Sequence, residues 1–226
     1  MDRARALAEA GEPARLAVWA GEQTAGRGRQ GRSWLSPPGN LYVTLLLRPA
    51  GAPAAAARLG FAAGLALADA ASAWLAPERV ALKWPNDLLI DGAKAAGLLL
   101  ESSGRGRRLD WLLIGSGVNL ASHPEGLGYP VTSFAAAGAA ISPAELLESY
   151  LKFFEIHCNL LEKQGFSSLR AAWLKRARGL GGPLTVRLPG ASLSGIFRDL
   201  DEDGALVLEE ASGRRRRITA AEVYFG

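Results

Sequence analysis

Cysteine and histidine are scarce in this sequence of 226 residues. It contains one cysteine, Cys158, and two histidines. A single cysteine excludes an intramolecular disulfide framework and indicates a reducing compartment, and two histidines argue against a structural metal site. No apolar run approaches the ~20 residues that a membrane-spanning helix needs, and residues 1–13 lack the apolar stretch of a signal peptide. We therefore expect a soluble, cytoplasmic protein with no membrane partner.

Lysine is also rare, because 21 of the 26 basic residues are arginines. A composition that uses arginine almost everywhere makes each remaining lysine informative. Two of the five lysines, Lys83 and Lys94, fall eleven residues apart in one segment. The formal net charge of +4 mildly favours anionic ligands.

Hydrophobic periodicity predicts an α+β protein. Helices are predicted over residues 3–10, 54–75, 142–163 and 168–178. Strands are predicted over residues 16–20, 41–47, 79–84, 88–90, 95–101 and 109–120. A capping box at Ser142–Glu145 begins the third helix, and Asp91-Gly92 is a hairpin signal. The basic, glycine-rich residues 102–108 are expected to join the last two strands.

The composition changes near residue 179. Residues 184–225 contain short β-rich runs with no helical pattern. The runs are separated by the turn pairs Pro189-Gly190, Asp203-Gly204 and Ser212-Gly213. This pattern predicts two domains, a larger one over residues 1–179 and a small β-barrel over residues 180–226.

Residues 26–32, GRGRQGR, satisfy the pattern G-x-G-x-x-G. A dinucleotide-binding fold needs a helix directly after the glycines, but residues 32–39 read RSWLSPPG and cannot begin a packed helix. No lysine follows a glycine, which excludes a Walker A loop. Glycines allow close approach to a ligand, and arginines recognise carboxylates and phosphates. The loop therefore suits a mobile cover over a phosphorylated species; the alternative is a flexible basic surface loop that touches nucleic acid.

Residues 83–87, KWPND, end one predicted strand and begin the next. Trp84 and Pro85 would partly desolvate Lys83, and we expect Asp87 to be the partner that keeps Lys83 ionised. Lys94 begins an apolar strand and is flanked by small residues, which suggests a cation at the edge of a pocket. Taken alone, Lys94 also fits a surface lysine after a turn.

The two segments together resemble the biotin protein ligases. The resemblance rests on GRGRQGR-x-W, KWPNDL, K-x-x-G and residues 117–120 (GVNL) in this order, and it covers essentially the whole chain. Lipoate and octanoyl ligases share the fold but lack the KWPND string with its second lysine. The resemblance is to the monofunctional type, because no predicted helix-turn-helix of the repressor-type ligases is present, so no operator binding is expected.

The resemblance implies a two-step reaction. Biotin and Mg-ATP give biotinyl-5′-AMP and pyrophosphate, and a specific lysine of a biotin carboxyl carrier protein then attacks the mixed anhydride. It also implies a catalytic domain similar to class II aminoacyl-tRNA synthetases, with a mixed, mostly antiparallel sheet and flanking helices, followed by an SH3-like barrel. Mg²⁺ is expected to arrive with ATP rather than on a protein metal site. A homodimer is compatible with the resemblance.

Site residues follow from the matched motifs. Biotin binding is expected from Gln23, Arg27, Gly28, Arg29 and Lys94. Contacts with ATP and the adenylate are expected from Arg27, Arg29, Trp34, Asn86 and Asn119. Lys94 and Arg29 are the expected catalytic residues, because their charges would stabilise the pentacoordinate phosphate. Lys83 and Asp87 are expected to be orienting residues: Asp87 would orient Lys83 or help to position the acceptor lysine.

Two features depart from the family pattern. The family has a Ser-Thr-Asn-like segment before the first helix that bonds the biotin ureido ring, and here Met1-Asp2-Arg3 stands where that segment should end. We expect either a start further upstream or different ureido contacts with poor biotin affinity. The family often has a basic residue near the end of the barrel for ATP; here residues 224–226 read YFG, so we expect that contact from elsewhere, for example Arg187 or Arg198.

Other functions remain open at this point. A ligase of the same fold could act on lipoate or another acyl acid. A nucleic-acid-binding protein would use the basic runs at residues 105–108 and 214–217, which we instead expect to be solvated turns. No protein nucleophile is evident: His157 is expected in the core, and His123 on a surface loop.

Overall fold

The computed structural model describes the chain except residues 51–52, 107, 189–190, 220 and 226, and except the side chains of residues 53–55. The elements of its larger part are α1 (Asp2–Glu9), β1 (Leu16–Ala20), η1 (Arg29–Gly31), β2 (Leu41–Leu47), α2 (Pro53–Ala71), η2 (Pro77–Arg79), β3 (Val80–Lys83), β4 (Asp87–Ile90), β5 (Ala93–Arg105), β6 (Arg108–Val118) and α3 (Pro143–Lys175). No helix among the described residues is long and apolar enough to span a bilayer.

The strands of this part form one six-stranded sheet in the order β1-β2-β6-β5-β4-β3. Every neighbouring pair of strands is antiparallel, which confirms the predicted α+β class with an antiparallel sheet. One prediction was wrong: residues 102–105 continue β5 and pair with β6, from Ser102 opposite Leu112 to Arg105 opposite Arg108. A hairpin can extend through polar, glycine-bearing residues, because its pairing uses only the backbone.

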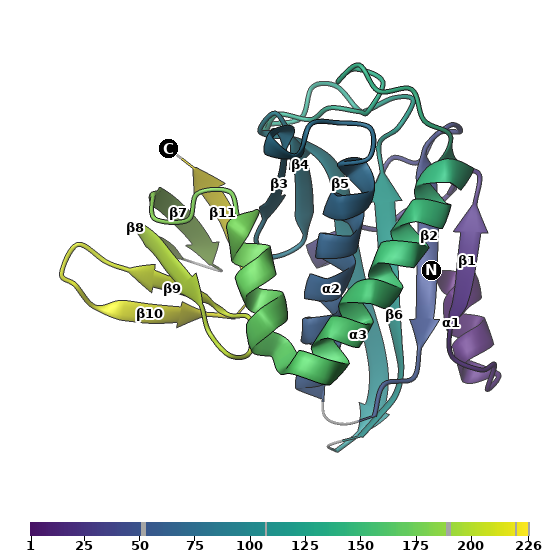
Figure 1. The fold of residues 1–226 in the computed structure, drawn as a ribbon, viewed down its shortest axis with the longest axis horizontal. Helices are drawn as coiled ribbons and strands as arrows, with labels where there is room; N and C mark the ends of the chain where they lie inside the picture. Colours follow the sequence, from purple (N-terminus) through teal and green to yellow (C-terminus); the bar gives the residue numbers. More distant parts are fainter. Residues whose placement is uncertain (51–52, 107, 189–190, 220, 226) are drawn as a thin grey trace.

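The two faces of the sheet are covered unequally (Figure 1). Leu41, Val43 and Leu45 alternate along β2 and join the main core with the buried residues of α2 and α3. Leu46 points to the opposite face, where it packs with Ala4 and Ala8 of the short helix α1. Helices α2 and α3 therefore close one face, whereas α1 covers only part of the other.

Helix α3 begins and breaks where its sequence predicts. Ser142 and Glu145 form the expected capping box: the Ser142 Oγ accepts from the Glu145 N–H (3.3 Å), and the Glu145 carboxylate accepts from the Ser142 N–H (2.9 Å). The two helices predicted on either side of residue 165 form one element interrupted at Gly165, whose φ of 75° is a glycine conformation. His157 lies in the core as expected, with its Nε2 2.6 Å from Asp69 Oδ2.

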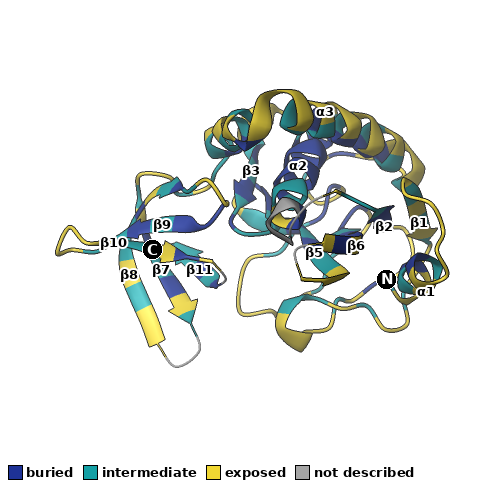
Figure 2. Cartoon of the chain, turned by 90° about the horizontal axis from the view of Figure 1, so that it is seen from below, coloured by how far each residue is buried: buried dark blue, intermediate teal, exposed yellow. Residues whose placement is uncertain are grey.

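The C-terminal part is a small β domain (Figures 1 and 2). Its strands are β7 (Pro183–Leu188), β8 (Ala191–Leu200), β9 (Leu206–Glu209), β10 (Arg215–Ile218) and β11 (Glu222–Phe225). They form one antiparallel sheet in the order β10-β9-β8-β7-β11. Strands β10 and β11 are its edges, and no pairing between the described residues closes it into a barrel.

A buried tryptophan connects the two sheets. The indole N–H of Trp84 donates to the Gly204 carbonyl (3.0 Å) in the turn between β8 and β9. Gly204 has a φ of 83°, and a Cβ added there would lie 2.4 Å from the ring of Phe61 on α2. The turn therefore requires glycine, and the C-terminal sheet is held directly beside the KWPND segment.

Candidate functional site

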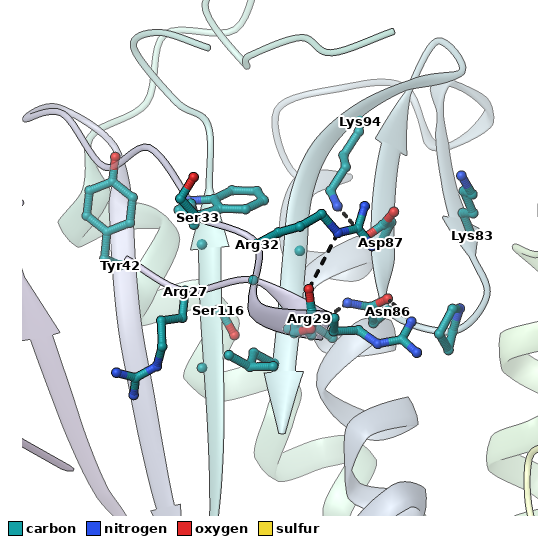
Figure 3. A pocket seen from close by; sticks show the side chains of 18 of the residues that line it. Arg27, Arg29, Arg32, Ser33, Tyr42, Lys83, Asn86, Asp87, Lys94 and Ser116 are labelled. Atoms are coloured by element: carbon teal, nitrogen blue, oxygen red, sulfur yellow. Dashed lines mark hydrogen bonds and ion pairs between the residues drawn. The ribbon is translucent and has the colours of Figure 1, made fainter. Parts of the chain in front are cut away.

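A cavity of about 770 Å³ opens on the face of the six-stranded sheet that α2 and α3 leave uncovered. It is lined by the glycine-arginine loop, by the segment from Lys83 to Lys94, by β5 and β6, and by the last strand β11. The two motifs quoted from the sequence therefore lie on one cavity (Figure 3).

Glycines in β5 and β6 form the floor of this cavity beneath Trp34. A Cβ added to Gly117 would lie 2.6 Å from the Trp34 Nε1, and one added to Gly97 would lie 3.2 Å from the indole ring. Any side chain at Gly117 would displace the ring. The indole N–H of Trp34 is buried against this floor and has no hydrogen-bond acceptor among the described residues.

The glycine-arginine loop is folded back on itself. The backbone N–H of Trp34 donates to the Gly26 carbonyl (2.9 Å), and Arg27 pairs with Ser33 in a β-bridge. A Cβ at Gly26 would lie 2.3 Å from the Trp34 carbonyl oxygen, so this approach requires glycine. Gln30 has a positive φ of 57° at the tip of the loop. The spacing of the glycines thus shapes a short hairpin that carries Arg27 on its first arm and Arg29 at the beginning of its tip.

Lys94 lines the cavity and pairs with Asp87. The Lys94 Nζ is 2.7 Å from Asp87 Oδ1, and their side chains are 18% and 15% exposed. The contact is an ion pair without the alignment of a hydrogen bond. The ammonium also lies 5.4 Å from the centre of the Trp34 ring and 5.9 Å from that of Tyr129. The expectation that Asp87 pairs with Lys83 is corrected, because its ion-pair partner is Lys94.

A bulge explains this change of partner. In the pairing of β4 with β5, Asp87 lies opposite Gly97 and Leu89 lies opposite Lys94. The register between the two strands therefore shifts by one residue between Leu88 and Leu89, which is the bulge. A bulge re-aims the side chains that follow it, and the Lys94 side chain extends toward Asp87 (Figure 3). The Lys94 backbone is also held by the next loop, because its N–H donates to the Pro130 carbonyl (2.9 Å).

Lys83 lines the cavity beside the C-terminal sheet. Its Nζ lies 5.6 Å from the ring centre of Tyr224 and 5.9 Å from that of Phe225. Burial is the main influence on this amine and lowers the pKa of Lys83 below its usual value of 10.5, while the charge of Asp87 acts in the opposite direction. Asp87 therefore acts on Lys83 only through space.

The loop arginines point in different directions. Arg29 donates to the Asn86 Oδ1 (3.1 Å), and burial lowers the pKa of Arg29. Arg27 instead turns away from Lys94 (Figure 3) and forms a bidentate pair with Asp2 of α1, at 2.7 and 3.1 Å. The structure thus brings Arg29 and Lys94 to the same part of the cavity, but it does not place the Arg27 guanidinium there.

The remaining expected residues divide into two groups. Gln23, Gly28 and Asn86 line the cavity, and Gln23 donates to the Ser36 Oγ (3.2 Å). Asn119 does not belong to the described lining: it is buried, and its amide donates to the Thr132 carbonyl (3.1 Å). In this structure Asn119 supports the wall of the cavity from behind.

Several lining residues were not predicted from the sequence. Arg178, Glu222, Tyr224 and Phe225 all line the cavity. Arg32 forms an ion pair with Glu222, which links the glycine-arginine loop to β11. Nothing in the local sequence near residues 222–225 indicates a ligand site; only the docking of the C-terminal sheet brings β11 there. Arg187 and Arg198, the expected ATP contacts, are not part of the described lining.

One of the two basic runs considered for nucleic-acid binding, residues 214–217, lies mostly in β10, where three of its arginines form ion pairs. Arg215 pairs with Glu209 and Arg216 with Glu210. Arg217 pairs with Asp201 and Asp203. His123 is only half-exposed, and its Nδ1 lies 3.1 Å from the Ser133 Oγ. Among the described residues no cluster of three or more His, Cys, Asp or Glu side chains could hold a metal ion.

The chain is similar to proteins of established activity. Residues 6–119 match the biotin/lipoate A/B protein ligase family, and residues 179–226 match the biotin protein ligase C terminal domain. Over 216 residues the chain is 46% identical to the biotin–[acetyl-CoA-carboxylase] ligase of Paracoccus denitrificans, covering 92% of this chain and 90% of that protein. It is 31% identical to the bifunctional ligase/repressor BirA of Escherichia coli, covering 83% of this chain and 60% of the relative.

Solved structures extend the similarity to the whole fold. The biotin protein ligase from Aquifex aeolicus in complex with biotin and ATP superposes with a TM-score of 0.82 at 25% identity, covering 98% of this chain and 94% of that chain. The biotin protein ligase from Leishmania major in complex with biotinyl-5-AMP superposes with a TM-score of 0.61 at 27% identity, covering 97% and 94%.

Proposed function

The chain belongs to the biotin protein ligase family, and we propose that it joins biotin to a carrier protein in two ATP-dependent steps. It forms biotinyl-5′-AMP from biotin and ATP, releasing pyrophosphate, and it transfers biotin to a specific lysine of a biotin carboxyl carrier protein. The observation that carries this proposal is the meeting of Lys94, Arg29 and Trp34 in one cavity, although they come from segments about 60 residues apart.

The chemistry of the first step suits these residues. The biotin carboxylate attacks the α-phosphorus of ATP, and both groups are anionic. The Lys94 ammonium and the Arg29 guanidinium would offset their repulsion and stabilise the pentacoordinate phosphate. Asp87, 2.7 Å from the Lys94 amine, fixes the position of that charge. In the second step the acceptor amine attacks the carbonyl carbon of the anhydride, and AMP leaves.

Further parts of the proposal follow from this assignment. Gln23 and Gly28 would contact biotin, and Trp34, Asn86 and Arg29 the adenylate. Arg27 would join them only after leaving Asp2. Mg²⁺ would be held by phosphate oxygens of ATP. We also propose a catalytic domain over residues 1–179 and a C-terminal domain over 180–226, acting in the cytoplasm without a specific DNA site; a homodimer is compatible with this arrangement.

Biotin-dependent exchange of labelled pyrophosphate into ATP tests the activity directly. We expect exchange with biotin, and labelling of a carrier protein when it is added. Exchange that depends on lipoate and not on biotin would instead support a lipoate-type ligase of the same fold. Tight, salt-dependent binding of DNA or RNA without any response to biotin and ATP would support the nucleic-acid alternative, which the paired arginines of β10 disfavour.

A further inference from the structure

The segment of residues 128–132 runs beside Lys94 and is bonded to its backbone. The first part of this segment lines the cavity, and the ring centre of Tyr129 lies 5.9 Å from the Lys94 Nζ. The Lys94 N–H donates to the Pro130 carbonyl (2.9 Å), and the Thr132 N–H donates to the Lys94 carbonyl (2.9 Å). Both hydrogen-bonding groups of the Lys94 backbone are therefore engaged by the 128–132 segment.

This segment takes the place of a strand next to Lys94. The pairing of β6 with β5 ends at Val118 opposite Ala96, so Lys94 lies beyond the end of that ladder. The pairing between Lys94 and Val131 is an isolated parallel bridge. An isolated bridge has no neighbouring pairs that keep its register. The position of the 128–132 segment therefore depends on contacts from outside it.

Asn119 supplies such a contact from behind the cavity wall. Its side-chain amide donates to the Thr132 carbonyl (3.1 Å), and its backbone N–H donates to the Ala95 carbonyl (2.8 Å). Asn119 thus joins the 128–132 segment to the residue of β5 that follows Lys94. It is 2% exposed, and removing its amide would leave the Thr132 carbonyl without this donor.

Asn119 is itself held in place by buried groups. Its carbonyl accepts from the Phe134 N–H (3.0 Å). The Oδ1 of Asn40 accepts from the N–H groups of the three residues that follow Asn119, at 2.8, 2.9 and 3.2 Å. Asn40 is also 2% exposed. The amide that meets Thr132 is therefore fixed relative to the six-stranded sheet.

We propose that Asn119 is a positioning residue for Lys94, and that it acts through the 128–132 segment. This inference rests on the proposed function. The place of the Lys94 ammonium depends on the place of its backbone as well as on Asp87. A cation stabilises the pentacoordinate phosphate best when it is held in place before the charge develops. This role differs from the contact with the adenylate that the family resemblance implies for Asn119.

Kinetics with two nucleotides separate these two roles. Asn119→Ala should lower kcat of biotin-dependent pyrophosphate exchange by about tenfold to a hundredfold and leave KM for ATP within about threefold. Inosine triphosphate, which has a carbonyl oxygen in place of the 6-amino group of ATP, serves as a competitor. The ratio of its inhibition constant to KM for ATP should stay within about twofold of the wild-type ratio. A contact with adenine would instead raise KM for ATP and reduce that ratio.

Hydrogen exchange measures the positioning of Lys94 without any turnover. In Asn119→Ala the amide protons of Lys94 and Thr132 should exchange about tenfold faster than in the wild-type chain, because the segment that they bond to is less well held. The amide proton of Leu113, in the middle of β6, should keep its rate within about threefold. NMR of the full chain follows these protons one by one, so a local effect is distinguished from a general loss of stability.

Tyr150 offers a matched control. It is fully buried in α3, and its hydroxyl lies 3.0 Å from the Ser116 Oγ of β6. Tyr150→Phe removes a buried hydrogen bond next to the same strand, but one that does not reach the 128–132 segment. It should lower the melting temperature about as much as Asn119→Ala does. It should keep kcat within about threefold and leave the exchange of the Lys94 amide proton unchanged.

A second variant covers the case in which Asn119→Ala does not fold. Asn119→Ser keeps a polar atom but not the reach of the amide, and it should change kcat and hydrogen exchange in the same direction. Unchanged exchange of the Lys94 and Thr132 amide protons, or a loss confined to KM for ATP, would overturn the proposal. If the wild-type chain shows no biotin-dependent exchange of pyrophosphate, the proposed function fails, and hydrogen exchange still decides whether Asn119 fixes Lys94.

Discussion

Lys94 and Lys83 lie in the same cavity but in different electrostatic environments. Lys94 has a carboxylate 2.7 Å away and is packed between Trp34 and Tyr129. Lys83 has two aromatic rings for neighbours, and burial lowers its pKa. Asp87 therefore fixes the charge of Lys94 before any ligand binds. Lys83 lies beside the C-terminal sheet and has no ion-pair partner among the described residues.

This difference suggests that the two lysines have different roles in the reaction. A lysine paired with Asp87 is positioned in advance and can act on charge that develops in the transition state. A partly desolvated lysine gains most from an anion that arrives with the substrate. We therefore expect changes near Lys94 to affect the chemical step most strongly, and changes near Lys83 to affect nucleotide binding, pH dependence and stability.

The largest effect is expected from Lys94→Ala. It removes the cation next to the reacting carboxylate and phosphate, so biotin-dependent pyrophosphate exchange should fall by about a thousandfold or more. The melting temperature should also fall, because Asp87 is left without its ion-pair partner, so exchange is measured at a temperature at which the variant is shown to be folded. Wild-type exchange rates in a folded Lys94→Ala protein would remove Lys94 from its assigned role.

A smaller but clear loss is expected from Asp87→Asn. The amide keeps the shape of Asp87 but not its charge, so the Lys94 ammonium would lose its fixed partner and sample other positions. Exchange should fall by about tenfold to a hundredfold, mainly in kcat.

The control for this variant is Glu222→Gln, which removes the partner of Arg32 at the other end of the cavity. We expect Glu222→Gln to lower kcat by no more than about threefold, since its effect reaches the α-phosphate only through the loop. If both variants lose kcat equally, the contrast between the two ends of the cavity does not hold.

Much of this site followed from sequence order, and the rest depended on contacts between distant segments. The Asp91-Gly92 pair correctly predicted the hairpin between Lys83 and Lys94, and both turn residues have positive φ. The partner of Asp87 could not be predicted, because an alternating pattern does not reveal the bulge between residues 88 and 89.

Long-range packing decided two further features. Arg27 pairs with Asp2, 25 residues earlier, and no pattern in the loop distinguishes it from Arg29, which points to Asn86. The place of β11 in the cavity wall depends on the Trp84–Gly204 contact, which joins residues 120 positions apart. Propensity and spacing describe local structure, but they carry no information about which segments dock.

The pH dependence of the first half-reaction should distinguish the two lysines. Burial lowers the pKa of Lys83 below 10.5, so its charge is lost as the pH rises toward that value, and with it the attraction for ATP. In Lys83→Arg the charge persists, because arginine stays protonated throughout this range. The alkaline fall in kcat/KM for ATP should therefore move to higher pH in Lys83→Arg. Profiles that coincide for wild type and Lys83→Arg would assign that fall to another group.

The smallest expected effect concerns stability. Because the pKa of Lys83 is lower in the folded than in the unfolded protein, the unfolded state binds more protons between the two values, and stability rises with pH in that window. Lys83→Met keeps the stem and removes the charge, so it should raise the melting temperature at pH 7 by about 1–3 °C. It should also remove the rise in stability with alkaline pH, as followed by calorimetry from pH 7 to about pH 10.

Lys94→Met is the comparison: it leaves Asp87 buried without a partner and should lower the melting temperature. A Lys83→Met protein less stable than wild type would mean that Lys83 is satisfied by the folded chain itself, and the two lysines would then differ in position rather than in charge environment.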